Sequence, residues 1–130
     1  AAITGLDVAS EYGYEIFRER GLVHVSSNKY EDSLGDFTSA IELKPEVFDA
    51  YLYRAETYRK LGEHLKARVD LNVALTLEPN QPDVIFESGI NYRMLQNDKN
   101  ALQEWEKLIN KYPDSNWHKL AQENIRLISQ

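Results

Sequence analysis

The chain has 130 residues, no cysteine, and 21 Asp and Glu side chains against 15 Lys and Arg, which gives a net charge of −6. These values exclude disulfides and thiolate metal sites, and they disfavour nucleic acid as a partner because the negative field repels a phosphate backbone. No apolar run reaches the roughly 18 residues that a membrane helix needs. We therefore expect a single soluble domain over residues 1–130, with a cytoplasmic location slightly favoured over export and no direct membrane insertion.

Prolines recur at a fixed spacing along the chain. Pro45, Pro79 and Pro113 follow one another at intervals of 34 residues, and each stands at the end of an apolar pattern with the period of a helix. Proline ends a helix because it lacks the amide hydrogen that continuation needs. A fixed period of this size is typical of stacked repeat proteins, which offer surfaces to partners rather than pockets for chemistry.

Each period is predicted to contain two helices joined by a short turn. In chain order these cover residues 14–28 and 30–43 in a first unit (14–47), 51–61 and 65–77 in a second unit (48–81), and 83–95 and 100–111 in a third unit (82–115). Gly62, between the two helices of the second unit, suits the left-handed residue that closes a helix. The leader, residues 1–13, either extends the first helix backwards through Tyr12 or stays disordered.

Small and bulky residues recur at equivalent places in the three units. The first helix of each unit carries a small residue at Gly21, Ala55 or Gly89, and the second carries a small one at Ser33, Ala67 or Ala101 and a bulky one at Phe37, Leu71 or Trp105. A small residue lets two helices approach closely, and a bulky one fills the space beside it. The pattern therefore predicts tightly packed helix pairs.

The tail is predicted to form one more helix. Between Asn116 and Ser129, apolar residues fall largely along one side of a helix, at Trp117, Leu120, Ala121, Leu127 and Ile128. The last unit of a stack has an apolar face with no successor, and a helix that is apolar on one side would cover it. We expect residues 116–130 to be such a capping helix.

The middle unit carries the pattern of a known family. Tyr51-x-x-Arg54-Ala55-x-x-Tyr58, followed by Ala67-x-x-x-Leu71-x-x-Ala74 and Pro79, resembles the tetratricopeptide repeat. The first and third units fit the same register. All three units depart from the family at its leucine position, which holds Arg20, Arg54 and Ser88 in turn. The resemblance implies an all-α fold: a right-handed α-solenoid of antiparallel helix pairs, with three repeats, a capping helix and about seven helices.

The resemblance also implies a function and a site. It is that of a non-catalytic protein–protein interaction scaffold or adaptor that binds a partner peptide or helix in its concave groove, with the oligomeric state left open. The implied groove residues are Arg18, Leu22, Leu52, Tyr53, Glu56, Arg59, Lys60, Phe86, Ile90, Arg93 and Met94. Two alternatives remain: the apolar members lean onto the adjacent helix, and the charged members serve only to stabilise helix ends. A structural subunit of a larger, self-associating or membrane-associated assembly is the alternative function.

One branch of the family grips the acidic tails of chaperones with a clamp of cations and asparagines. The equivalent positions in this chain hold Arg18, Leu22, Tyr53, Asp83 and Glu87. Only Arg18 keeps its positive charge, and two cations are replaced by carboxylates that repel an acidic tail. Binding of a chaperone C-terminal tail is therefore disfavoured.

Catalysis is the rival class of function. The three histidines, His24, His64 and His118, lie in different predicted elements without the spacing of a metal-binding helix. Glycine-rich phosphate loops and nucleophile motifs are absent from the sequence. We expect no enzyme activity, no metal and no cofactor.

Overall fold

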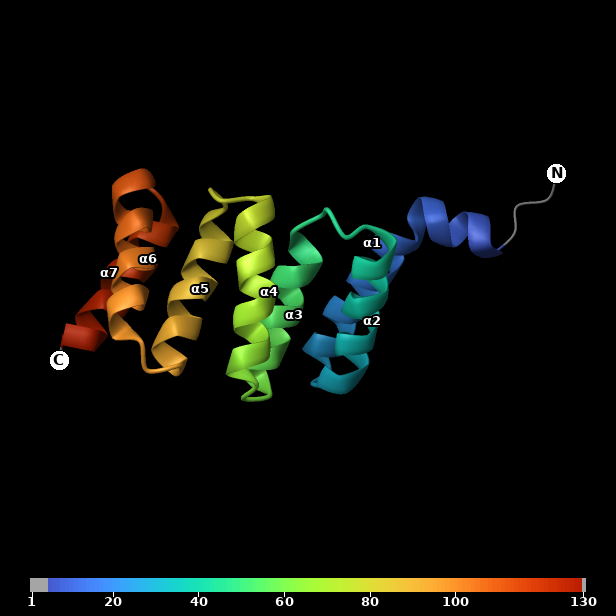
Figure 1. The fold of residues 1–130 in the computed structure, drawn as a ribbon, viewed down its shortest axis with the longest axis horizontal. Helices are drawn as coiled ribbons and strands as arrows, with labels where there is room; N and C mark the ends of the chain where they lie inside the picture. Colours follow the sequence, from blue (N-terminus) through green and yellow to red (C-terminus); the bar gives the residue numbers. More distant parts are fainter. Residues whose placement is uncertain (1–4, 130) are drawn as a thin grey trace.

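A computed structural model describes the backbone of residues 5–129 and side chains from Tyr12 onward. Over this range the chain is all-α, as the sequence predicts. It forms seven helices, which are α1 (Gly5–Ser26), α2 (Tyr30–Leu43), α3 (Asp49–Lys60), α4 (His64–Leu77), α5 (Pro82–Met94), α6 (Asp98–Lys111) and α7 (Asn116–Ser129). The helices stand side by side in one elongated array, with α1 at one end and α7 at the other (Figure 1).

The first helix is longer than the repeat pattern predicts. It begins at Gly5 rather than near Tyr14, so the leader extends α1 backwards, and only residues 1–4 of the leader lie outside the described range. Its start projects beyond α2 at the end of the array (Figure 1). The other helices agree with the predicted spans to within about two residues, the usual uncertainty of helix ends.

The turn inside each unit is built on one left-handed residue. Asn28, Gly62 and Gln96 have φ angles of 60°, 75° and 62°, and they are 34 residues apart along the chain. Glycine adopts this conformation without steric cost, asparagine tolerates it, and glutamine is strained in it. The repeat therefore extends to backbone conformation, and the predicted role of Gly62 is confirmed.

Within a unit, the two helices pack as the small and bulky residues predict. Phe37, Leu71 and Trp105 are all fully buried. A Cβ atom added to Gly21 would lie 2.5 Å from the ring of Phe37, and one added to Gly89 would overlap the indole of Trp105. The absence of a side chain at these two glycines therefore determines how closely the paired helices approach.

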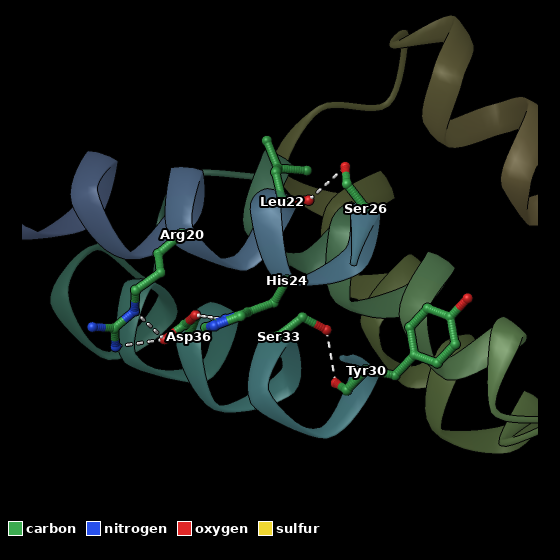
Figure 2. A network of polar contacts seen from close by, with 7 residues as sticks. All are labelled: Arg20, Leu22, His24, Ser26, Tyr30, Ser33 and Asp36. Atoms are coloured by element: carbon green, nitrogen blue, oxygen red, sulfur yellow. Dashed lines mark hydrogen bonds and ion pairs between the residues drawn. The ribbon is translucent and has the colours of Figure 1, made fainter. Parts of the chain in front are cut away.

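Partly buried polar contacts reinforce the packing within the first unit and the second. In the first unit, Arg20 Nε and Nη2 donate to Asp36 Oδ1 at 2.9 and 2.6 Å, and His24 Nδ1 lies 2.6 Å from Asp36 Oδ2 (Figure 2). Burial raises the pKa of Asp36, but the bonds from Arg20 and His24 outweigh it and hold this pKa below its usual value. Arg54 and Asp70 form the equivalent bidentate pair in the second unit, at 2.8 and 2.7 Å. The arginines at two of the family's leucine positions therefore join the two helices of a unit.

Arginines also bridge one unit to the next. Arg54 Nη1 donates to Thr38 Oγ1 of α2 at 3.1 Å, across the junction of the first two units. Arg68 of α4 donates to Asn91 Oδ1 at 2.7 Å and to Ser88 Oγ at 2.8 Å, across the next junction. Each junction is therefore fixed by hydrogen bonds of defined direction as well as by apolar packing.

The array is curved. Among the described residues, α1 contacts α3 and α3 contacts α5, whereas α2 has no contact with α4, nor α4 with α6. Because the first helices of successive units approach more closely than the second helices, α1, α3 and α5 lie on the inner side of the curve. We call the side formed by these three helices the inner surface.

The last helix covers the end of the third unit. Helix α7 packs on α6 and α5, with Ala121 fully buried and Trp117 edge-on to Phe86 at 5.6 Å between ring centroids. Its opposite side carries Glu123 and Arg126, which are exposed and form an ion pair. The predicted capping helix is therefore present where the apolar face of α5 and α6 needs it.

Candidate functional site

The predicted groove residues all lie on the three helices of the inner surface. Helix α1 supplies Arg18 and Leu22, α3 supplies Leu52, Tyr53, Glu56, Arg59 and Lys60, and α5 supplies Phe86, Ile90, Arg93 and Met94. The structure separates them into a buried pair, a partly exposed apolar set and a charged set.

The expectation that Leu52 and Phe86 are exposed is wrong. Leu52 is 2% exposed and packs in the core of the second unit with Leu71 and Val84. Phe86 is 8% exposed, because the rings of Trp105 and Trp117 both meet it edge-on. These two side chains lean onto neighbouring helices, which is the alternative that the sequence left open, and they are unavailable to a partner.

The remaining apolar residues are accessible to different degrees. Met94 is exposed, and Leu22, Tyr53 and Ile90 are half-buried. The Tyr53 ring lies 5.8 Å from the ring of Phe37 in α2, so part of its surface is used inside the molecule. Burial, and then the nearby Asp49 carboxylate, raise the pKa of the Tyr53 hydroxyl above its usual value. The apolar part of the inner surface is therefore smaller than predicted.

An ion pair joins α1 to α3 on the inner surface. Arg18 Nη1 donates to Asp49 Oδ2 at 2.9 Å, and the Tyr14 hydroxyl donates to the same carboxylate. Burial raises the pKa of Asp49, the backbone amides of the first turn of α3 lower it, and the carboxylate of Asp83 raises it again. The net pKa of Asp49 is above its usual value. Negative charge is thus only partly compensated at this point.

A second ion pair joins α3 to α5. Arg59 Nε donates to Glu87 Oε2 at 2.6 Å, and the Glu87 side chain is 7% exposed. Burial raises the pKa of Glu87, and the guanidinium of Arg59 offsets part of that rise. Such a buried carboxylate depends on its partner, because a charge without one is costly in a low-dielectric site.

Glu56 lies between these pairs and has no hydrogen-bond partner among the described residues. Burial, followed by the negative charges of Glu87 and Asp83, raises its pKa from an ordinary 4.5 to about 7. The positive charge of Arg59 lowers the pKa of Glu56 by more than Asp83 raises it, and Lys60 lowers it by less, but burial and Glu87 outweigh both cations. The middle of the inner surface is therefore acidic, and Glu56 is poised to change charge near neutral pH.

The charged residues also stabilise their own helices. Asp49 and Asp83 lie in the first turns of α3 and α5, and Arg59, Lys60 and Arg93 lie in last turns. These placements complement the helix dipole, as the alternative explanation requires. Asp49 and Arg59 also form ion pairs between helices, so the role of these two residues is not confined to helix ends.

Sequence reasoning did not include two residues of this surface among the site residues. Asp49 and Glu87 are the carboxylates that receive Arg18 and Arg59, at sequence separations of 31 and 28 residues. Asp49 lies in the first turn of α3, where an acid favours the helix dipole, and Glu87 was considered only as a position of the chaperone-tail clamp. A pairing between units follows from the curvature of the array, which the sequence pattern does not specify.

The described part of the chain offers no cluster of metal ligands, and it carries a surface hollow outside the inner surface. Among residues 12–129, no group of three or more His, Asp or Glu side chains could hold a metal ion. A surface hollow of 260 Å³ is lined by Asn72, Val73, Thr76 and Leu77 of α4, away from the inner surface. Over the described residues, no helix has the length and apolar character needed to cross a membrane.

Curated proteins with similar sequences carry the same kind of segment within longer chains. The chain is 25% identical over 123 residues to Translocon at the outer membrane of chloroplasts 64 of Pisum sativum, covering 95% of this chain and 21% of that protein. It is 28% identical over 110 residues to Protein O-mannosyl-transferase TMTC3 of Homo sapiens, covering 84% of this chain and 12% of that protein. The chain thus spans about a fifth or less of the length of these curated relatives.

Solved structures share the architecture. The first TPR of Spaghetti (RPAP3) bound to an HSP90 peptide superposes with a TM-score of 0.83 at 22% identity, covering 90% of both chains. The TPR domain of Arabidopsis OM64 gives 0.82 at 19% identity, covering 90% of this chain and 97% of that one. A tetratricopeptide repeat protein from Parabacteroides merdae gives 0.79 at 26% identity, covering 90% of this chain and 46% of that one.

The family model described as tetratricopeptide repeat matches residues 49–80 and 83–115, which are the second and third units of the array. The first unit shares features with both of these units. Its turn has a left-handed residue at the equivalent position, its Gly21 lies against an aromatic ring as Gly89 does in the third unit, and its arginine–aspartate pair matches that of the second unit. On this evidence the chain belongs to the tetratricopeptide repeat family.

Proposed function

We propose that this chain is a non-catalytic adaptor that binds a partner peptide or helix on the inner surface of α1, α3 and α5. The observation that supports this most is the charge arrangement there. Ion pairs from Arg18 and Arg59 hold the three helices together, while Glu56 between them forms no ion pair with any of the described residues. A rigid surface with one unsatisfied charge is suited to recognise a partner rather than to stabilise the fold.

The partner should bring a cationic side chain to Glu56. A lysine or arginine near this carboxyl group would favour its ionised form, because an opposite charge lowers the pKa of an acid. Binding would then release a proton near neutral pH, since the pKa of Glu56 in the chain without a partner is about 7. The exposed Met94 and the half-buried Ile90 offer apolar contact on the same surface.

Acidic chaperone tails remain disfavoured partners in this proposal. Similar folds in solved structures include one bound to an HSP90 peptide and one bound to an HSP70 peptide, so the fold likeness lends the exclusion no support. The exclusion rests on side chains alone: Asp83 and Glu87 stand at cation positions of the clamp, and Glu87 already holds Arg59. Calorimetric titration with the peptide SRMEEVD, named in one of those structures, tests it. Tight binding would overturn it.

The adaptor proposal can be tested by placing a photoreactive amino acid at one position and mapping cross-linked partner segments by mass spectrometry. Met94, on the inner surface, is the test position, and Leu65 of α4 is the control because it is exposed on a helix outside that surface. We expect the same partner segment to cross-link at position 94 and not at 65, and to lose this cross-link when Glu56 is changed to Gln. Equal labelling from both positions would contradict the proposal.

A self-associating structural subunit is the second candidate. The observation that favours it lies at the opposite end from the cap, where Tyr12, Ile16 and Val23 of α1 are exposed. Sedimentation of the chain at increasing concentration tests this second candidate, because only a self-associating chain gains mass as its concentration rises. The two functions use different residues and are compatible.

A further inference from the structure

The outer face of α1 carries a line of exposed side chains that the inner surface does not use. Tyr12, Ile16 and Val23 are 52%, 51% and 63% exposed. Glu19, Arg20 and Ser27 are exposed along the same line. Spacings of three, four and seven residues place all six on one side of a helix and its final turn. We call these six residues the α1 stripe.

Two residues of the α1 stripe, Ile16 and Val23, occupy positions that are buried in the other units. Ile16 corresponds to Ala50 and Val84, both fully buried, by steps of 34 residues. In α3, Ala50 packs with Ala40 and Ile41, which belong to the second helix of the preceding unit. Val23 corresponds in the same way to Thr57 and Asn91, each 1% exposed. The part of the stripe around Ile16 and Val23 is therefore a junction surface on which no unit packs among the described residues.

Arg20, the arginine of the stripe, also lacks the hydrogen bond across a junction that the equivalent Arg54 makes. Arg54 uses Nε and Nη2 for Asp70 of its own unit and Nη1 for Thr38 across the junction. Arg20 also uses Nε and Nη2 for the aspartate of its unit (Figure 2), but its Nη1 has no partner among the described residues. The side chain of Arg20 is 56% exposed, against 19% for Arg54.

The path of the backbone argues against a covering helix from the same chain. The loops that place a preceding helix on α3 and α5 lie directly before Asp49 and Pro82. At the equivalent place the backbone of α1 is continuous helix, because α1 runs without a turn from Gly5 to Ser26. A helix supplied by another molecule meets no such obstacle.

The stripe is complementary to itself when two copies run antiparallel. With a two-fold axis between Glu19 and Arg20, Ile16 faces Val23 of the second copy, and Tyr12 faces Ser27 of the second copy. Glu19 then faces Arg20 of the second copy. Arg18 occupies only Oε1 of Glu19, so Oε2 is left for the guanidinium group opposite. We propose that a second copy of this chain packs its α1 against the α1 stripe, antiparallel and about this axis.

Such an interface is isologous, since each residue pair occurs twice. It is also small, because one helix face meets another, and stable interfaces usually bury about 1,600 Å² in total. We expect a reversible dimer whose fraction rises with the concentration of the chain, rather than a permanent one. This contact deepens the self-association candidate and leaves the inner surface free for a partner.

Sedimentation of the full chain over a wide concentration range tests the dimer. Val23→Glu is the test variant, and Val69→Glu is its matched control because Val69 of α4 is 64% exposed. We expect Val23→Glu to be monomeric at every concentration and Val69→Glu to dimerise like the unmodified chain, both with unchanged circular dichroism. A chain that is monomeric throughout, or equal behaviour of the two variants, would overturn the proposal.

Disulfide trapping tests the orientation, and the chain offers a clean background because it has no cysteine. In the double variant Ile16→Cys/Val23→Cys, the two thiols of one chain are about 10 Å apart along the helix, too far to pair with each other. An antiparallel dimer cross-links the double variant and neither single variant. A parallel dimer cross-links each single variant instead, and would contradict the arrangement.

The trapping result also distinguishes a second copy of the chain from a segment of a different protein on the stripe. It is independent of the test of the adaptor function. If the stripe receives a helical segment of a different protein, the purified chain gives no cross-linked dimer, and the second-copy proposal fails. Failure of the adaptor function would appear as lost labelling at position 94 while the dimer persists. Loss of the dimer with labelling intact would count against the present inference alone.

Discussion

The indole of Trp105 lies directly against the backbone of Gly89, and its Nε1 donates a hydrogen bond to the Phe86 carbonyl at 3.2 Å. The ring is fully buried, so it cannot move aside into solvent. Helices α5 and α6 can therefore pack at their observed separation only because residue 89 is glycine, which has no Cβ atom. The same relation joins Gly21 and Phe37 in the first unit.

We predict that Gly89→Ala destabilises the chain by about 1–3 kcal/mol, because the added methyl group overpacks the contact with Trp105. Gly35→Ala in α2 is the matched control, since a Cβ atom there meets nothing within 4 Å. It should stabilise the chain by about 0.5–1 kcal/mol, as alanine is the better helix former. Urea unfolding of both variants measures the difference. A gain in stability at position 89 would contradict the packing argument.

The Arg59–Glu87 pair leads to a second prediction. Arg59→Met leaves the buried Glu87 carboxylate without its guanidinium partner, which should cost about 2–4 kcal/mol at pH 8. The cost should be smaller at pH 5, where protonation relieves the buried charge. Lys60→Met, one residue further along α3, removes an exposed cation that has no ion pair in the described structure. Equal unfolding midpoints for the two variants in urea would show that the pair contributes nothing.

The raised pKa of Glu56 makes stability depend on pH. The folded chain holds this proton up to about pH 7, whereas the unfolded chain loses it near 4.5, so the folded state binds more protons between these values. The free energy of unfolding must then fall as pH rises through that interval, by up to roughly 3 kcal/mol. Glu56→Gln should remove this fall and be more stable than the unmodified chain at pH 8.

Urea unfolding at several pH values between 5 and 8 checks this prediction. Glu106→Gln serves as control, because Glu106 is exposed on α6. The control should keep the pH dependence of the unmodified chain. If Glu56→Gln keeps it too, the dependence arises from another group.

The capping helix gives a fourth prediction. A chain that stops after Ser115 uncovers Phe86 and the apolar face of α5 and α6, so it should melt at a lower temperature and be less soluble. Ala121→Glu tests the same contact with a single change: a carboxylate placed at a fully buried position should cost several kcal/mol. Gln122→Glu, next to it and exposed, should be neutral. An unchanged melt of the shortened chain would exclude the capping role.

The fold was accessible from the sequence because the repeat determines it locally. The interval between Pro45, Pro79 and Pro113 limits where helices end, and the glycines opposite bulky residues specify which faces meet. Each of these signals acts within one unit, where neighbours in space are also close in sequence. Local rules are therefore sufficient to place helices and their cores.

The site was less accessible because its residues are defined by contacts between units. The register assigned Leu52 and Phe86 to the inner surface, but Val84 and Trp117 from later helices take part in covering them. How far a side chain of the inner surface is buried therefore depends on the size of residues in a later unit or in the capping helix. The raised pKa of Glu56 has the same origin, since Glu87 and Asp83 come from the next unit.

The way each helix touches chiefly its sequence neighbours has a mechanical consequence. Without a central core shared by all seven helices, tension applied to the two ends would extend the array by opening one junction at a time. A force–extension trace should then show several small steps in place of one large rupture. Such a molecule can yield elastically when its two ends are pulled apart, and re-form the lost contacts when the load is released.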